Sequence, residues 1–502
     1  MSSRAVGGLA CTMEVRDPWD ASLVGRVPRA TPADALAAVD QAAVARDVAR
    51  RMPVHQRMSV LQGAADRIAA EAEGFARLIA REGIKTIREA RREVARCVGT
   101  LRLCAEEARR LTGETIAFDQ VPGGEGRSGY YTREPVGVVL AITPFNDPLN
   151  LVAHKVGPGI AAGCPVILKP HERTPLSALK LADALSRAGL PAGVLQVLTG
   201  DGRELGPALL GDDRVRLVSF TGGVEAGRRV ATMAGLKRLE MELGGNCPTL
   251  VLADADLDGA AAACISGAFW AAGQNCLHVQ RIIADRSVYE PFRDRLRQFA
   301  AGVRLGPKLD EATDMGCLID AVAAERVERL LASAVQDGAR VVTGGRRRGP
   351  TGFEPTLVEG VSEDHPLMTT EVFGPVTVLA AAHTFEDAVE WANATDYGLH
   401  AAVFTRDLGL AHEAVHRLEA GAVMVNDSTD YRIDAMPFGG VKLSARVPTP
   451  RRLRRQQTSR DGRETRQNAR AFVFLMDYAE QRRINSEAAR AWSKGTSNSP
   501  SA

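Results

Sequence analysis

Several features that would assign this protein to a class are absent from its 502 residues. No run of about 18 apolar residues occurs, which excludes a membrane-spanning helix of the usual kind. The eight cysteines are scattered without a Cys-x-x-Cys pair or a Cys/His cluster at zinc spacing, so we expect neither a disulfide framework nor a metal. No apolar segment precedes the first acidic residues, so we expect no signal peptide and a cytoplasmic location.

A strong net charge is also lacking, because 63 Lys and Arg residues face 61 Asp and Glu residues. This balance predicts no nucleic-acid partner. Basic residues are nevertheless concentrated in residues 446–502, a stretch rich in Arg, Pro, Ser and Gln that has little apolar periodicity. We expect this tail to be disordered, and a basic arm that binds nucleic acid is the alternative interpretation. The hydrophobic fraction of 45% and the chain length predict two or three folded domains.

Two kinds of hydrophobic periodicity divide the chain. Residues 32–112 repeat apolar side chains at the spacing of amphipathic helices. From residue 136, short apolar runs alternate with helical stretches; these runs are 136–142, 165–170, 194–200 and 214–220. A second alternating region spans 248 to about 425. The alternation predicts two α/β domains, the first built on a doubly wound parallel sheet.

Three loops follow strands of the first predicted sheet, at the edge where such sheets bind ligands. The loop TPFN (143–146) contains Asn146, which either donates its amide to an oxyanion or caps a turn. The loop KPHE (169–172) contains Lys169 and Glu172, which suit ribose hydroxyls but also commonly start helices. The loop FTGGVEAG (220–227) either binds a phosphate on backbone N–H groups or is a plain tight turn.

Two further segments contain candidate reactive groups. Cys276, in the loop GQNC (273–276), is a candidate nucleophile, and an inert buried thiol is the alternative. None of the nine histidines lies in a recognisable partner motif for a Cys–His pair. Glu242, in ELGG (242–245), is therefore the better candidate base, with a salt-bridge residue as the alternative.

Together and in this order, the five segments, with EVFGP (371–375) and PFGG (437–440), closely resemble the aldehyde dehydrogenase family. The resemblance extends from about residue 15 to Lys442. It implies an α/β fold with a doubly wound, Rossmann-like cofactor domain, a second α/β catalytic domain and a small oligomerisation element. The implied ranges are 1–122 and 136–247 for the cofactor domain, 248–425 for the catalytic domain, 123–135 and 426–445 for the oligomerisation element, and 446–502 for an atypical tail.

The resemblance also implies roles for individual residues. Cys276 would add to an aldehyde to form a thiohemiacetal and then a thioester, Asn146 would hold the oxyanion, and Glu242 would activate the hydrolytic water. No metal is implied. The residues implied in binding the nicotinamide cofactor are Lys169, Glu172, Thr221, Gly222, Gly223, Gly227, Leu243, Glu371 and Phe373.

The same resemblance narrows the cofactor and the substrate. Glu242 favours the acid-forming class over the CoA-acylating one, and Glu172 favours NAD, with NADP as the alternative. The segments around Asp147 and 426–440 resemble the branch that acts on small polar aldehydes such as lactaldehyde. Phosphonate aldehydes (phosphonoformaldehyde or phosphonoacetaldehyde) are the alternative. His154 and Arg102 are the candidates for binding an anionic substrate group.

Two departures from the family pattern stand out. Gly223 occupies a position where the family usually has Ser, which we expect to be tolerated. After Ser444 the sequence changes abruptly, as translation in another reading frame would cause, and resequencing of the coding DNA tests this hypothesis. The family implies a homodimer or homotetramer whose terminal strand joins a neighbouring subunit. A chain without that strand predicts a weakened oligomer, and a catalytically impaired relative is the alternative to an active enzyme.

Overall fold

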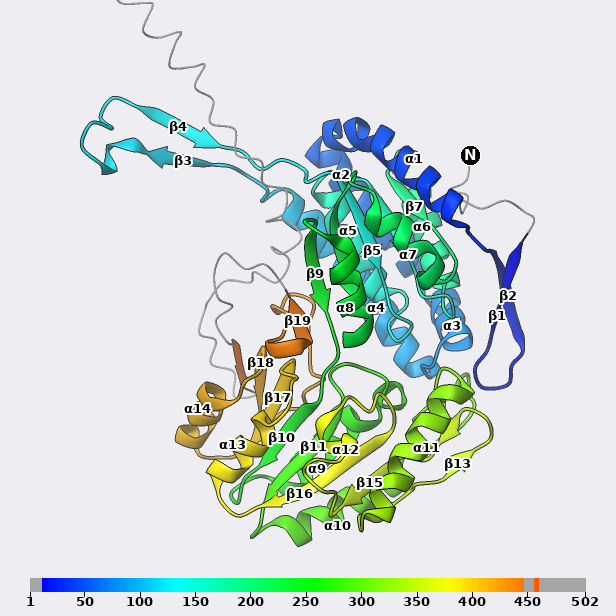
Figure 1. The fold of residues 1–502 in the computed structure, drawn as a ribbon, viewed down its shortest axis with the longest axis vertical. Helices are drawn as coiled ribbons and strands as arrows, with labels where there is room; N and C mark the ends of the chain where they lie inside the picture. The colour runs from blue at the N-terminus through cyan, green and yellow to red at the C-terminus, as the bar shows by residue number, and fades with distance from the viewer. Residues whose placement is uncertain (1–10, 447–455, 460–502) are drawn as a thin grey trace, which may run out of the picture.

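The computed structural model describes residues 11–446 and 456–459, which form two α/β domains and a projecting two-stranded arm (Figure 1). The prediction of the fold class is therefore confirmed. The chain enters through the hairpin β1 (Thr12–Arg16) and β2 (Leu23–Pro28) and continues into the predicted helical region. Its helices are α1 (Pro32–Arg51), α2 (Val54–Ala70), α3 (Ala72–Glu82) and α4 (Ile87–Ala108). Capping boxes at Thr31 and Thr86 satisfy the first N–H groups of α1 and α4.

The sheet of the first α/β domain, which we name the cofactor domain after its predicted role, has the strand order β19-β9-β8-β5-β6-β7. Its strands are β5 (Val138–Ile142), β6 (Val166–Lys169), β7 (Leu195–Val197), β8 (Val215–Thr221), β9 (Arg238–Glu242) and β19 (Ala445–Arg446). All neighbours pair in parallel except β19, which is antiparallel to β9. The chain passes from β5 to β6 and β7 and then returns to the other side of β5 at β8. The strand order therefore reverses between β5 and β8, which is where sheets of this class bind ligands.

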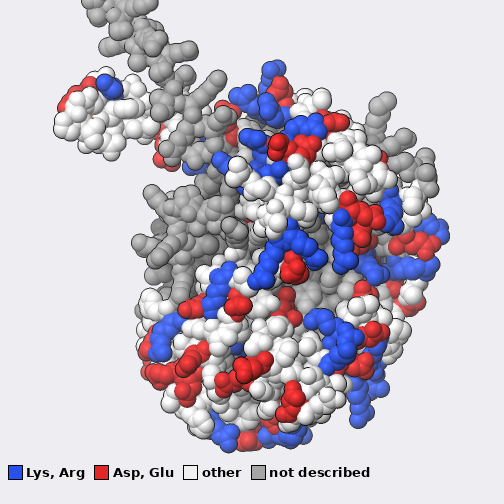
Figure 2. Space-filling view, viewed as in Figure 1, with Lys and Arg blue, Asp and Glu red and all other residues white. Residues whose placement is uncertain are grey.

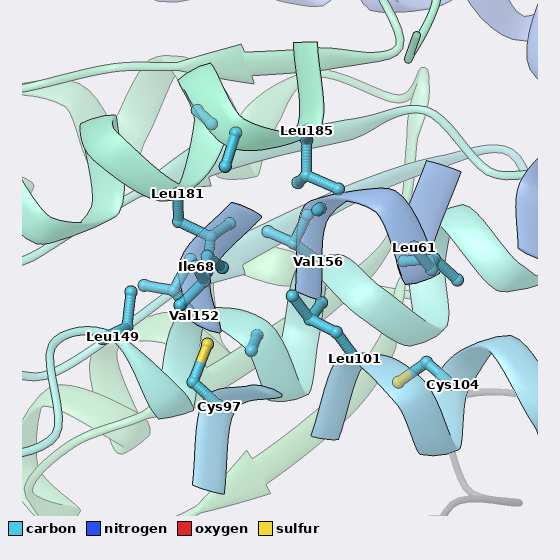
Figure 3. Close-up of a cluster of buried hydrophobic side chains, with 14 of the residues drawn as sticks. Leu61, Ile68, Cys97, Leu101, Cys104, Leu149, Val152, Val156, Leu181 and Leu185 are labelled. Atoms are coloured by element: carbon cyan, nitrogen blue, oxygen red, sulfur yellow. The ribbon is translucent and has the colours of Figure 1, made fainter. Parts of the chain in front are cut away.

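Helices cover both faces of this sheet. One face packs on α2, α4, α5 (Asn150–Ala161) and α6 (Leu176–Arg187), whose side chains meet in the core drawn in Figure 3. The other face packs on α1, α7 (Gly202–Gly211) and α8 (Val224–Ala234). In β5, Val139 and Ala141 face the first core, whereas Val138 and Leu140 face the second. Burial on both faces explains why this strand is a continuous apolar run in the sequence.

The catalytic-domain sheet has the strand order β12-β15-β16-β11-β10-β17-β18-β20. Its strands are β10 (Cys247–Val251), β11 (Val279–Asp285), β12 (Arg340–Thr343), β15 (Thr356–Glu359), β16 (Val376–Ala382), β17 (His400–Phe404), β18 (Ala422–Val425) and β20 (Gln456–Ser459). One face packs on α9 (Leu257–Phe269) and α10 (Tyr289–Ala301), and the other on α13 (Phe385–Asn393) and α14 (Leu408–Arg417). At one end, α11 (Ala321–Gln336), α12 (Pro366–Thr369) and the short pair β13 (Arg347–Arg348) and β14 (Gly352–Phe353) complete the domain.

Two segments differ from the predicted domain ranges. The antiparallel strands β3 (Glu114–Ala117) and β4 (Ser128–Tyr131) form an arm that projects from the cofactor domain (Figure 1), and it begins before the predicted boundary at residue 123. Residues 456–459, which belong to the atypical tail, form β20 and pair in parallel with β18 of the same chain. Residues 447–455 and 460–502 lie outside the described residues, so the predicted disorder of the tail stays a prediction there.

The described surface mixes charges of both signs. Figure 2 shows Lys and Arg side chains interspersed with Asp and Glu side chains over both domains on the face that it draws. No helix among the described residues is long and apolar enough to cross a membrane.

Candidate active site

A cavity of about 1200 Å³ lies where the ends of strands from both domains meet. Asn146 reaches it from the loop after β5, Glu242 from the end of β9, and Cys276 from the loop before β11. The structure thus brings the three predicted reactive residues into one cavity, although they lie far apart in the sequence. Most of the residues predicted to bind the cofactor also line it; these are Lys169, Thr221, Gly222, Gly223, Leu243, Glu371 and Phe373.

The loop that presents Cys276 has a tightly constrained backbone. After α9, Ala271 and Ala272 adopt positive φ angles of 51° and 53°, which turn the chain sharply toward the cavity. Gly273 also has a positive φ of 67°, and a Cβ there would lie 2.2 Å from the carbonyl oxygen of Gly374. Only glycine fits this close approach, so Gly273 helps to set the position of the thiol.

Hydrogen bonds of Gln274 hold the same loop. Its buried amide donates to the carbonyl oxygens of Ala271 at 3.2 Å and Cys317 at 3.1 Å. Its Oε1 accepts from the backbone N–H of Ile319 at 2.9 Å. A single side chain therefore connects the loop to the segment around residue 318 and fixes the place of Cys276, two residues further on.

The surroundings of Cys276 favour its protonated thiol. Burial raises its pKa well above the ordinary value, and the nearby charges of Glu371 and Glu242 raise it further. His278, two residues on, is no base for it, because burial lowers the pKa of this histidine to about 3. Burial also lowers the pKa of the cavity residues His154 and His171 to about 4, so Glu242 stays the predicted base.

Asn146 and Glu242, whose catalytic roles stay predictions, differ in their surroundings. The Asn146 side chain is 6% exposed, and its Oδ1 has no hydrogen-bond partner among the described residues. Burial raises the pKa of Glu242 to about 7, although Lys155 and Arg432 act in the opposite direction. A carboxyl group with this pKa exchanges a proton readily near neutral pH, which suits a general base.

The crevice between β5 and β8 fits a dinucleotide. Gly223 caps α8 without a side-chain hydrogen bond, so the first N–H groups of this helix are available to a phosphate. A Cβ at Gly223 would meet nothing within 4 Å, so the family's usual Ser would fit there. Gly227, one turn on, does not line the cavity; a Cβ there would lie 2.6 Å from the Leu243 side chain, so Gly227 permits helix–strand packing.

Polar residues at both ends of the crevice suit the two riboses of a dinucleotide. Nζ of the buried Lys169 donates to Glu172 at 3.0 Å. Burial opposes ionisation of Glu172, but His171 and Lys169 bring its pKa down to about 2. Glu371 accepts from the backbone N–H of Gly245 at 3.1 Å. Glu172 itself does not line the cavity, but its hydrogen-bond donor Lys169 does.

The aldehyde dehydrogenase family model matches residues 7–447 of this chain. The chain belongs to the aldehyde dehydrogenase family. The match ends close to the start of the atypical tail, so the tail is the part of the chain that departs from the family, as the sequence indicated.

Relatives of known activity are similar over most of their length. This aldehyde dehydrogenase is 47% identical over 433 residues to aspartate-semialdehyde dehydrogenase 1 of Pseudomonas canavaninivorans, covering 86% of this chain and 92% of that protein. It is 42% identical over 433 residues to 3-sulfolactaldehyde dehydrogenase of Priestia aryabhattai, covering 86% and 90%. It is 38% identical over 436 residues to lactaldehyde dehydrogenase of Methanocaldococcus jannaschii, covering 86% and 92%.

Solved structures of the family include both cofactor types. A glyceraldehyde-3-phosphate dehydrogenase from Methanocaldococcus jannaschii in complex with NADP is 35% identical, with a TM-score of 0.85 and coverage of 94% of this chain and 98% of that chain. An NAD-dependent aldehyde dehydrogenase from Sinorhizobium meliloti is 34% identical, with a TM-score of 0.85 and coverage of 89% of each chain. The prediction of an NAD(P)-dependent aldehyde dehydrogenase is therefore confirmed.

The cavity of this aldehyde dehydrogenase places the two candidates for an anionic substrate group differently. His154 lines it, but its Nε2 is 2.9 Å from Oδ1 of Asp434. Arg102 does not line it; this exposed side chain donates to Asp66 of α2 at 2.9 Å. The structure therefore does not bring Arg102 to the substrate.

Five other arginines line the cavity, and the sequence reasoning missed them; these are Arg92, Arg96, Arg228, Arg326 and Arg432. Arg96 donates to Asp434 at 3.0 Å. Arg92 and Arg432 instead lie over the rings of Trp270, at 5.5 Å, and Phe438, at 4.1 Å. Across 11–446 and 456–459, neither Arg92 nor Arg432 forms an ion pair with a carboxylate. In the sequence, the one feature that could have pointed to a cavity arginine is the position of Arg432, a few residues before the PFGG segment.

Proposed function

We propose that this chain oxidises a small polar aldehyde to its carboxylic acid, with Cys276 as the nucleophile. The observation that supports this proposal is that the thiol of Cys276, the amide of Asn146 and the carboxylate of Glu242 converge on one cavity beside the dinucleotide crevice. Each group comes from a different element, so their meeting is a property of the fold and not of a local motif. Asp147, which forms an ion pair with Lys85, makes one side of the cavity polar, and this suits a polar substrate.

In the first step, the Cys276 sulfur forms a bond to the aldehyde carbon, and the carbonyl oxygen receives the thiol proton. Negative charge develops on that oxygen before the proton arrives. The Asn146 amide and the Cys276 backbone N–H would stabilise this charge, because hydrogen-bond donors fixed in a buried site need no reorganisation during the reaction. The product of the step is a thiohemiacetal.

A nicotinamide cofactor, which Lys169, Glu371 and the N-terminus of α8 would hold, would supply the oxidation by taking up a hydride. The hydroxyl proton leaves to water, and a thioester of Cys276 remains. The role of the chain in this step is to fix the carbon beside the cofactor, which the covalent bond to sulfur achieves.

Hydrolysis of the thioester regenerates the site. Glu242 takes a proton from a water molecule whose oxygen bonds to the thioester carbon, and the carbon–sulfur bond breaks. The carboxylic acid then returns its own acidic proton to the Cys276 sulfur. The raised pKa of the thiol favours this return, because the sulfur binds a proton more tightly than a carboxylate product does.

A panel of aldehydes tests the proposal. Purified protein is incubated with NAD or NADP and with lactaldehyde, aspartate semialdehyde, phosphonoacetaldehyde or hexanal, and formation of the reduced nicotinamide is followed. We expect kcat/KM for at least one polar aldehyde to exceed that for hexanal by about tenfold or more, because an apolar chain leaves the charged wall of the cavity unpaired. No reduction of either cofactor with any polar aldehyde would contradict the proposal.

A specific observation favours an anionic substrate, of which the phosphonate aldehydes of the sequence analysis are one case. Arg92 and Arg432 line the cavity without carboxylate partners, and burial lowers the pKa of Arg432. The guanidinium of the half-buried Arg432 gains from an anion that it binds directly. We therefore propose an acidic group on the substrate, such as a carboxylate, sulfonate or phosphonate. The names of the aspartate-semialdehyde and 3-sulfolactaldehyde relatives are consistent with it.

Substitution of Arg432 tests this second proposal. We expect Arg432→Met to lower kcat/KM for phosphonoacetaldehyde by about 100-fold, since loss of a charged hydrogen bond costs about 1.5–3 kcal/mol. The value for lactaldehyde should change by less than about threefold. The matched control is Arg102→Met, which lies outside the cavity and should change neither value. Equal losses for both aldehydes in Arg432→Met would refute the anionic assignment.

We propose a homodimer or homotetramer in the cytoplasm, as in the sequence analysis. The arm formed by β3 and β4 supports the oligomer, because it projects from the cofactor domain and places the exposed Val121 between its strands (Figure 1). A projecting hairpin of this kind buries its apolar side chains only against another chain. Light scattering of the purified protein measures the oligomeric state.

A further inference from the structure

A second carboxylate lies behind Glu242, and the reaction steps above do not use it. Glu240 and Glu242 are two residues apart on β9, so their side chains point to the same side of the strand. In the neighbouring strand β8, Ser219 is the register partner of Glu240. Lys155 of α5 donates from Nζ to the Ser219 hydroxyl at 3.0 Å. All four residues line the active-site cavity.

This group of four residues, the β9 cluster, is incompletely hydrogen-bonded, and three of its members are buried. Lys155, Ser219 and Glu240 are 5%, 2% and 8% exposed. Within the described part of the chain, neither Oε1 of Glu240 nor Oε2 of Glu242 has a hydrogen-bond partner. A buried carboxylate oxygen without a partner is costly, so such atoms often mark a site that changes its protonation during function.

The charges of the β9 cluster allow it to hold one additional proton. Two carboxylates and one ammonium carry a net charge of −1, and one more proton makes the cluster neutral. Burial raises the pKa of Glu240 to about 8, although Lys155 and Ser219 lower it, and the charge of Glu242 raises it further. Burial lowers the pKa of Lys155 to about 8, against the effect of both carboxylates. The remaining charge that faces Glu242 is Arg432, which favours its ionised form.

We propose that Glu240, acting through Lys155 and Ser219, receives the proton that Glu242 takes from water during hydrolysis of the thioester. The Lys155 ammonium gives a proton to Glu240 by way of the Ser219 hydroxyl, and Lys155 regains one from Glu242. One proton thus moves from Glu242 to Glu240 and then to solvent through the cavity, while no other bond changes. Glu242 is ionised again for the next water molecule. This inference rests on the proposed function, because it requires a thioester that Glu242 hydrolyses.

A purely structural role for Glu240 makes different predictions. Suppose that Glu240 serves only to balance the charge of Lys155. The substitution Glu240→Gln would then disturb the fold or shift the pKa of Glu242. Removing a like charge beside Glu242 lowers that pKa, so the acidic limb of the pH profile would move to lower pH and the plateau would stay. If Glu240 receives the proton, the plateau of Glu240→Gln itself falls, because Glu242 then loses its proton slowly at every pH.

The test compares Glu240→Gln with the wild-type chain in two measurements, using the aldehyde on which the wild type is most active. Single-turnover formation of the reduced nicotinamide reports acylation and hydride transfer, and we expect it to change by less than about twofold. Steady-state turnover reports hydrolysis, and we expect its plateau to fall by about tenfold. Acyl-enzyme on Cys276, detected by mass spectrometry of the intact chain, should accumulate. Added imidazole, a small base that fits the cavity, should restore most of the lost rate.

Controls separate the possible outcomes. Glu386→Gln, whose side chain is 68% exposed on α13, should behave as the wild type. Ser219→Ala leaves every charge in place and should show the same loss and rescue, which keeps the test decisive if Glu240→Gln does not fold. An unchanged plateau, or a lowered plateau without acyl-enzyme or rescue by imidazole, would overturn the inference alone. A wild-type chain that forms no reduced nicotinamide would overturn the proposed function as well.

Discussion

Replacement of Cys276 by alanine should abolish aldehyde oxidation, with an expected fall in kcat of about 10⁴-fold or more. The reason is that no other described thiol can replace it. Cys247 contacts Cys276, but Cys247 is buried and its Sγ donates to the carbonyl oxygen of Cys276. Burial raises the pKa of Cys247 to about 12, so its thiolate is not formed at neutral pH. The measurement is turnover of the best aldehyde of the panel, followed by the reduced nicotinamide.

Cys11→Ser is the matched control for this loss. Cys11 is an exposed free thiol ahead of β1, outside the cavity, so its substitution should leave kcat unchanged. Cys276→Ala should also keep its affinity for the cofactor, because the crevice between β5 and β8 does not depend on the thiol. Normal oxidation by Cys276→Ala would show that the reaction does not pass through a covalent intermediate on this residue.

The sequence predicted the strands of the cofactor domain where both faces are buried. The segments that became β5, β6, β7 and β8 are apolar runs because helices cover them on both sides. The same criterion missed β9, whose sequence is RLEME. Its glutamates at 240 and 242 line the cavity, so a strand at a functional site has the pattern of a polar loop. Strand periodicity therefore fails at the place where the chemistry requires charge.

The candidate site was predictable as far as local motifs extend. Asn146 and Cys276 lie in short loops and Glu242 lies at the end of β9, each in a segment typical of the family, and the cavity brings them together. Arg96 and Arg102 show the limit of such reasoning. They lie six residues apart on α4, which corresponds to about 600° of rotation, or about 240° beyond a full turn. They therefore point in different directions, and only the packing of α4 decides which one faces the cavity.

The β9 cluster illustrates a second limit. Lys155 lies in a helix and Glu240 in a strand, and no motif connects them in the sequence. Their relation depends on the register between β8 and β9, which places Ser219 beside Glu240, and on α5 crossing the sheet above it. Sequence reasoning can assign each residue to an element, but a contact between elements follows only from how they pack.

Glu242→Gln should separate the two halves of the reaction. We expect hydrolysis of the thioester to slow by about 10²–10⁴-fold, the usual contribution of a general base. Hydride transfer should persist, so a single turnover still forms one equivalent of reduced nicotinamide, and the acyl group remains on Cys276. Rapid mixing followed by mass spectrometry of the intact chain measures both quantities. Glu290→Gln, whose side chain is 60% exposed, is the control and should turn over normally.

The pH dependence supplies an independent check of the same role. The base acts in its ionised form, and burial raises the pKa of Glu242 to about 7. The fraction of ionised Glu242 therefore falls as the pH drops below about 7, and hydrolysis in the wild-type chain should slow tenfold for each further pH unit. In Glu242→Gln this acidic limb should disappear, because the amide does not titrate. If hydride transfer were lost together with hydrolysis, the thiol of Cys276 would be the group that Glu242 deprotonates, and its assignment to the water would be wrong.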